Sequence, residues 1–213
     1  SGGVDNTIYG HKAGNLIDTG DDNVIMGNEA GKSVTIGRYN TAIGTQSLLT
    51  EDVGDRSVAI GYSALYSQNS DSNNEITGNV GIGFQAGNYN VTGQNNTYVG
   101  YMAGLGASGQ SNSNNTAVGK DALLAVTTGS GNVVIGQAAA DALTTGADNV
   151  VIGRIALSSA TAGMTDNIAI GANAMGSANN SSSDNNVAIG GSALASTGTT
   201  ASIGSIAIGF EAL

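Results

Sequence analysis

The chain repeats one short motif from end to end, and Ser57-Val58-Ala59-Ile60-Gly61-Tyr62-Ser63-Ala64-Leu65 is one of its clearest copies. A regular repeat of this kind indicates one structural unit that stacks on itself. The central glycine recurs at spacings of 17 to 22 residues, in twelve copies centred on Gly10, Gly27, Gly44, Gly61, Gly83, Gly100, Gly119, Gly136, Gly153, Gly171, Gly190 and Gly209.

Composition excludes several classes of protein. The 213 residues include 34 Gly, no Pro and no Cys, and only 4% are aromatic, so an enzyme domain with one large aromatic core is not expected. Sixteen acidic residues oppose six basic ones, giving a net charge of -10, so we expect no nucleic-acid partner. No segment approaches the roughly 20 apolar residues of a membrane helix, so we expect no membrane insertion.

Each copy predicts one extended strand that carries two apolar columns. The third residue before the glycine is β-branched in every copy, and the residue just before the glycine is Ile in eight. Two residues apart, these columns share one face of a strand, which we interpret as the inward face. The predicted core is represented by Val58, Ile60, Val133, Ile135, Val150, Ile152, Val187 and Ile189. The residue between the columns is mostly small, and we expect this small face to be covered by self-association.

Asparagine opens ten of the twelve copies, and Ser57 and Ser205 open the other two. Asparagines stacked in register can hydrogen-bond from one side-chain amide to the next. We therefore expect a structural ladder and not a set of ligand sites. Its members are Asn6, Asn23, Asn40, Asn79, Asn96, Asn115, Asn132, Asn149, Asn167 and Asn186.

The period sets the expected architecture. Seventeen residues suffice for a coil of two short strands and two turns, which is too small to enclose a large core. The prediction is an all-β chain, a parallel β-roll or flat β-solenoid of about twelve coils, forming a single repeat domain over residues 1–213. Residues 1–3 are a candidate cloning remnant, and 67–78 and 106–114 are expected to be extruded loops.

A family resemblance is carried by the same repeats. Residues 57–65, 186–194 and 205–209 resemble the head repeats of YadA-like trimeric autotransporter adhesins, and 40–48 and 115–123 are similar to repeats of bacteriophage tail-fibre proteins. The resemblance covers essentially the whole chain. It implies a left-handed parallel β-roll in a homotrimer, located outside a cell or on a virion, that attaches to a host cell-surface glycan or protein. Autotransporter repeats are typically shorter than 17 residues, and neither a membrane anchor nor a coiled-coil stalk is seen, which favours the phage fibre.

Motifs that could carry chemistry are explained more simply by the repeat. Residues 104–109 match G-x-G-x-x-G, and 27–33 resemble a phosphate-binding loop, but no helix-forming run follows either one. His11, the one histidine, occupies a variable column and is expected at the surface. The acidic runs 18–22 and 51–55 are interpreted as solvated loops, with an adventitious cation site as the alternative. We expect no catalytic residue, no metal and no cofactor.

Aromatic residues cluster in three consecutive copies. Tyr62, Phe84 and Tyr101 each follow a central glycine, and Tyr66, Tyr89 and Tyr98 lie in the same copies, as the sequence shows. An outward ladder of Tyr62, Phe84 and Tyr101 would suit sugar rings, whereas an inward ladder would strengthen the roll. Both interpretations stay open.

The sequence thus predicts a structural and adhesive segment of an extracellular or virion fibre, most simply a bacteriophage tail fibre that mediates host attachment. The alternatives are a head fragment of a bacterial trimeric autotransporter adhesin and a polymerising extracellular matrix filament. A polysaccharide-degrading solenoid enzyme is disfavoured, because no copy is broken by a pair of carboxylates.

Overall fold

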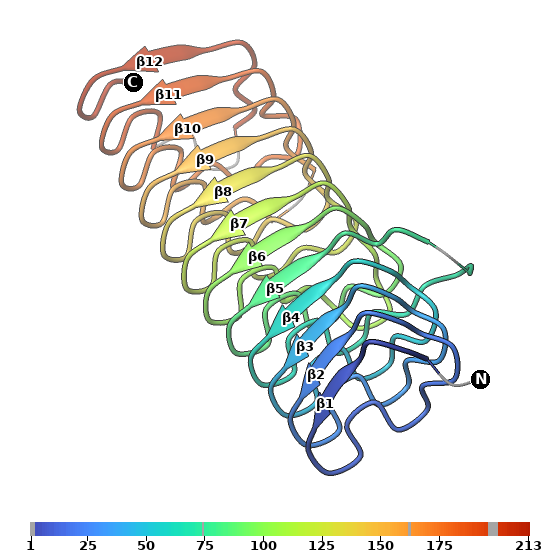
Figure 1. Ribbon diagram of the computed structural model, residues 1–213. Coiled ribbons are helices and arrows are strands. Elements are labelled where there is room, and N and C mark those ends of the chain that lie inside the picture. The colour runs from blue at the N-terminus through green and yellow to red at the C-terminus, as the bar shows by residue number, and fades with distance from the viewer. Residues whose placement is uncertain (1–2, 74, 162, 196–199) are drawn as a thin grey trace.

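The protein is a stack of twelve coils, seen in a computed structural model that describes residues 3–73, 75–161, 163–195 and 200–213 (Figure 1). Each coil contributes one strand, and the strands pair in chain order as one parallel twelve-stranded sheet. The strands are β1 Thr7–Tyr9, β2 Val24–Met26, β3 Thr41–Ile43, β4 Val58–Ile60, β5 Val80–Ile82, β6 Thr97–Val99, β7 Thr116–Val118, β8 Val133–Ile135, β9 Val150–Ile152, β10 Ile168–Ile170, β11 Val187–Ile189 and β12 Ile206–Ile208. The all-β, parallel β-solenoid class of about twelve coils is confirmed.

Equivalent positions of the motif lie directly on one another. Val58 pairs with Val80 across β4 and β5 even though the coil between them is 22 residues long instead of 17. The extra residues therefore leave the stack, and part of the chain between β4 and β5 projects from its side (Figure 1). Of the candidate cloning remnant, Ser1 and Gly2 lie outside the described residues, whereas the backbone N–H of Gly3 donates to Asp18 O at 2.6 Å.

One strand per coil is formed where two were expected. The second and fourth residues after each glycine have left-handed backbone angles, such as φ of 57° at Gln46 and 50° at Leu48. A strand needs extended angles at successive residues, so this wall of the coil is built from turns. Neighbouring coils are still hydrogen-bonded there, as between Leu48 N and Ala64 O at 3.0 Å.

The small column, and not the large one, fills the interior of the roll, so the predicted core is wrong. The middle residue of the strand is buried in every coil after the first, as at Ala59 and Ala117. The eight predicted core residues all lie on the outer side of the sheet: Val133, Ile135 and Ile189 are 36–40% exposed, and Val58, Ile60, Val150, Ile152 and Val187 are half-buried.

The width of the coil explains the reversal. The inward middle residue shares the narrow interior with two other columns, an Ala three residues after the glycine and often a Leu at the fourth. Both columns are buried, as Ala64 and Leu65 show in one coil. Two β-branched side chains per strand would overfill this space, whereas a single inward side chain fits, because interiors are packed close to their limit. This side chain is mostly Ala, with Ile25, Tyr98, Val134 and Val151 as larger exceptions.

The central glycine column is required by close contact between coils. Gly136 has φ of 140°, and a Cβ built on it would lie 2.5 Å from Gly153 O in the next coil. A Cβ built on Gly44 would likewise lie 2.5 Å from Gly61 O. A side chain at this position would therefore strain the backbone and also separate the coils.

Candidate functional site

The expected asparagine ladder is present inside the roll. In a typical step, the backbone N–H of Asn132 donates to Asn115 Oδ1 at 3.0 Å, and Asn132 Nδ2 donates to the same oxygen at 3.0 Å. The amide also donates to Gly146 O at 2.8 Å, so each asparagine joins its own coil to the previous one. Except at the first coil, the ladder is buried, which leaves its amides no access to a ligand.

A buried polar cluster lies where Ser57 replaces the ladder asparagine. Glu51 is fully buried and accepts hydrogen bonds from Val53 N, Gly54 N, Gln68 Nε2, Ser70 N and Ser70 Oγ. Gln68 Oε1 in turn accepts from Asn79 Nδ2 at 2.9 Å, where the ladder resumes. We call Glu51, Ser57, Gln68, Ser70 and Thr77 the polar plug.

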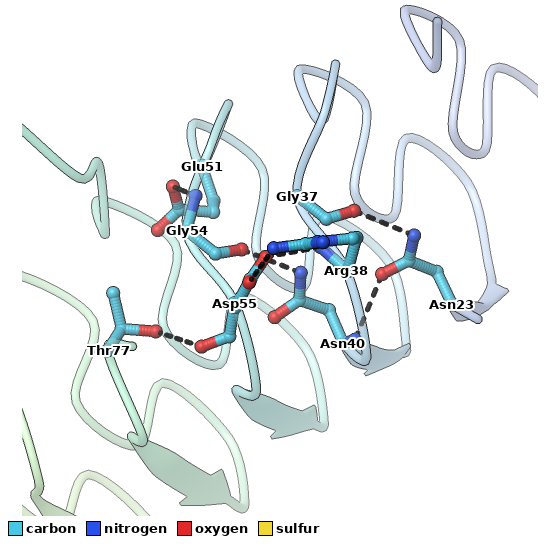
Figure 2. Close-up of polar contacts among 8 residues, drawn as sticks. All are labelled: Asn23, Gly37, Arg38, Asn40, Glu51, Gly54, Asp55 and Thr77. Atoms are coloured by element: carbon cyan, nitrogen blue, oxygen red, sulfur yellow. Dashed lines mark hydrogen bonds and ion pairs between the residues drawn. The ribbon is translucent and has the colours of Figure 1, made fainter. Parts of the chain in front are cut away.

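The acidic run 51–55 is thus a structural element and not a solvated loop. Figure 2 shows Glu51 bonded to Gly54, whose carbonyl accepts from Asn40, and Asp55 paired with Arg38 at 3.1 Å. Within the described part of the chain, no group of three or more His, Cys, Asp or Glu residues is placed to hold a metal ion.

The remaining motifs are part of the repeat. His11 is exposed and contacts Asn28 Oδ1 at 3.1 Å. Residues 27–33 and 104–109 run through the turns after β2 and β6, and a helix follows neither of them, so neither offers the helix N-terminus that holds a phosphate. No helix able to cross a membrane occurs in the ranges that the structure describes.

Tyr62, Phe84 and Tyr101 form the ladder that their spacing suggests. Their ring centroids are 5.3 and 5.1 Å apart, and the ring planes differ by 11° and 8°. The ammonium of Lys120 lies 5.5 Å from the Tyr101 ring centroid, on the next coil. Both faces of Phe84 are therefore covered by rings, so the ladder presents ring edges to solvent. Among the described residues, the outer face of Tyr101 meets the Lys120 ammonium, and no ring is stacked on the face of Tyr62 towards the coil of β3.

A groove with Tyr62 in its lining opens beside the ladder. It has a volume of about 230 Å³ and crosses the turns that follow β3, β4 and β5. Its lining is Gln46, Tyr62, Ser63, Tyr66, Gln85, Asn88 and Tyr89. We call this the aromatic groove. The sequence marked Tyr62, Tyr66 and Tyr89 as a cluster, but not the amide side chains between them, because their columns hold ordinary surface residues elsewhere. Tyr98, of the same cluster, is fully buried in the core.

An apolar surface follows the whole length of the sheet. We call the residues just before each glycine, with the β-branched column beside them, the outer apolar face. The first column is apolar in all twelve coils: Tyr9, Met26, Ile43, Ile60, Ile82, Val99, Val118, Ile135, Ile152, Ile170, Ile189 and Ile208. Every one of these side chains is exposed or half-buried in the single chain, so the face is far more continuous than the scattered apolar residues of an ordinary surface.

Comparisons with protein-family models, with curated proteins and with solved structures gave no match for this chain. Its function is therefore argued from the outer apolar face and the aromatic groove.

Proposed function

We propose that this chain is a structural and adhesive segment of an extracellular or virion fibre, a homotrimer whose role is attachment to a host cell surface. A bacteriophage tail fibre is the preferred setting. The observation that supports the proposal most directly is the outer apolar face, which joins twelve coils in one uninterrupted stripe.

The partner that matches this face best is another copy of the chain. The apolar side chains recur at the strand spacing of about 4.8 Å. Another β-sheet offers groups at the same spacing, and a second copy of the chain provides such a sheet. The face carries no charged residue in either of its columns. Burial of such a surface at about 25 cal/mol per Å² is a strong driving force for association. Three copies packed sheet to sheet would form a closed rod without a free apolar face.

The sequence analysis assigned self-association to the small column. Because that column is buried inside the roll, we propose the outer Val and Ile columns for this role instead.

The assembly is tested with charges placed on the outer apolar face. Ile135→Glu with Ile152→Glu would put unpaired carboxylates into the interface, at a cost on the order of several kcal/mol for each charge. Sedimentation should give three times the chain mass for the wild type and a lower mass or insolubility for the variant. Thr128→Glu, an exposed substitution in a turn, is the control and should leave the trimer intact.

Electron microscopy separates the fibre from the matrix alternative. Discrete short rods are expected for a fibre segment, whereas open-ended filaments would support a polymerising matrix protein. A wild type with the mass of one chain would overturn the homotrimer.

A further inference from the structure

We propose that the aromatic groove is a binding site for an uncharged saccharide chain, which deepens the proposed attachment function and rests on it. The lining combines three tyrosines with three side-chain amides and a serine, and it contains no charged side chain. Tyrosine offers a flat apolar face and a hydroxyl, and amides offer donors and acceptors for sugar hydroxyls.

Several polar groups of the groove have no partner within the described protein. The hydroxyls of Tyr62, Tyr66 and Tyr89 and the side-chain amide of Gln85 make no protein hydrogen bond there. Asn88 is held in one orientation because its Nδ2 donates to Ser63 O at 2.9 Å, and this leaves its Oδ1 as a fixed acceptor. Asn88 as a whole is only 4% exposed, but its Oδ1 is not among the enclosed polar atoms that lack a partner, so this acceptor remains accessible beside the groove.

The backbone of the groove is held by hydrogen bonds within the protein. Its turns are bonded from coil to coil, with Ser63 N donating to Thr45 O at 3.0 Å and Gln85 N donating to Tyr62 O at 2.9 Å. A preformed site loses little conformational entropy on binding, which matters for weak sugar contacts. The volume of about 230 Å³ is below the roughly 300 Å³ at which drug-sized pockets begin, so the groove suits a short piece of a longer chain.

The position of the groove in the repeat supports a function. Only here do aromatic residues stand five or six residues after the central glycine, at Tyr66 and Tyr89. The same coils contain the longest insertion of the repeat, between Gly61 and Gly83. Departures from an otherwise consistent pattern are expected where function and not packing selects the residues. In a trimer the groove would occur three times, so weak single sites would gain from avidity.

The lack of charge selects the ligand class. No cation lines the groove to neutralise an acidic sugar, and the chain as a whole carries a net charge of -10. Anionic saccharides would therefore be repelled, whereas neutral hexoses and N-acetylhexosamines would not.

Binding is measured by saturation-transfer NMR and by tyrosine fluorescence. The neutral probes are oligomers of glucose, galactose and N-acetylglucosamine, and the charged probe is a sialic acid oligomer. Tyrosine emission is readable because the chain has no Trp. We expect at least one neutral probe to bind and the charged probe not to bind. The pair Tyr66→Ala with Tyr89→Ala should weaken binding roughly tenfold or more, and Gln85→Ala should weaken it less.

Tyr101→Ala is the matched control, because Tyr101 is an exposed tyrosine of the same ladder that lies outside the groove. Sedimentation of every variant, measured alongside, shows whether the assembly is unchanged. A trimeric wild type that binds no neutral probe, or a groove variant that binds as well as the wild type, overturns the groove while the fibre proposal stands. Equal weakening by Tyr101→Ala would assign binding to the ladder instead. A wild type that binds sugar as a single chain would overturn the trimer and leave the groove.

Discussion

The coils around β3–β5 and those around β7–β9 fill the same interior position in opposite ways. Seven residues after the central glycine, the first region has Glu51 and Gln68 and the second has Val126 and Leu143, and all four are at most 1% exposed. The apolar core is correspondingly divided into two clusters, one ending at Leu65 and the other starting at Ala86. The polar plug lies where they meet.

This difference shows that the interior position accepts either a polar or an apolar side chain, provided that a polar side chain is hydrogen-bonded and an apolar one is packed against other apolar groups. Leu143 needs only apolar neighbours, whereas Glu51 needs five donors from its own coil and the next one. The plug appears where Ser57 interrupts the asparagine ladder, so its hydrogen bonds replace those of a missing amide. Both regions share the central glycine column. These glycines are required by backbone contact with the next coil, whatever side chains fill the interior.

The largest effect is expected at this shared column. Gly44→Ala and Gly136→Ala should each lower the free energy of unfolding by roughly 4 kcal/mol or more, because a Cβ would meet the next coil and adopt a strained φ. Denaturant unfolding followed by circular dichroism measures the loss. Gly109→Ala, with φ of 75° and no atom within 4 Å of its Cβ, is the control and should cost only about 1–2 kcal/mol. Unequal losses at Gly44 and Gly136 would contradict the idea of a common column.

A smaller loss in the free energy of unfolding is expected when the polar and the apolar interior residue are each replaced by the other type. Glu51→Leu leaves the backbone N–H groups of Gly54 and Ser70 without an acceptor, at about 1–3 kcal/mol for each buried group. Leu143→Glu buries a carboxylate without donors and should be at least as costly. Urea unfolding of both variants tests this. Glu51→Gln keeps one acceptor oxygen and should be milder. If Glu51→Leu were neutral or stabilising, the polar plug would be replaceable by ordinary apolar packing.

The smallest effect concerns Tyr98, which has an apolar ring and a polar tip and lies beside the junction of the two regions. Burial raises the pKa of Tyr98 above that of an unfolded tyrosine, about 10. Below that pH the hydroxyl is neutral in both states, and its stabilising contribution is complete. Above it the unfolded chain releases a proton that the folded chain keeps, so the free energy of unfolding falls by about 1.4 kcal/mol per pH unit.

Tyr98→Phe should remove this part of the alkaline slope and cost about 1 kcal/mol at neutral pH, since the hydroxyl is bonded to Asn96 Oδ1 at 3.1 Å. Thermal unfolding between neutral pH and pH above 10 measures both changes. An unchanged slope in the variant would show that Tyr98 ionises as readily in the folded chain as in the unfolded one.

The sequence by itself determined the period, the parallel stacking, the asparagine ladder and the place of the one strand that each coil forms, because each of these depends on one residue type recurring in register. It also indicated where the tyrosines gather. Only the tertiary structure decided which face of the strand is inside. Alternation places Val58 and Ile60 on one side and Ala59 on the other, but it does not say which side is the core. That choice depends on the width of the coil, which the left-handed turns after each glycine and the facing Ala and Leu columns keep too narrow for the larger pair. The polar plug and the amides of the aromatic groove were hidden for a related reason: they join residues of different coils, whose contacts exist only once the coils are stacked.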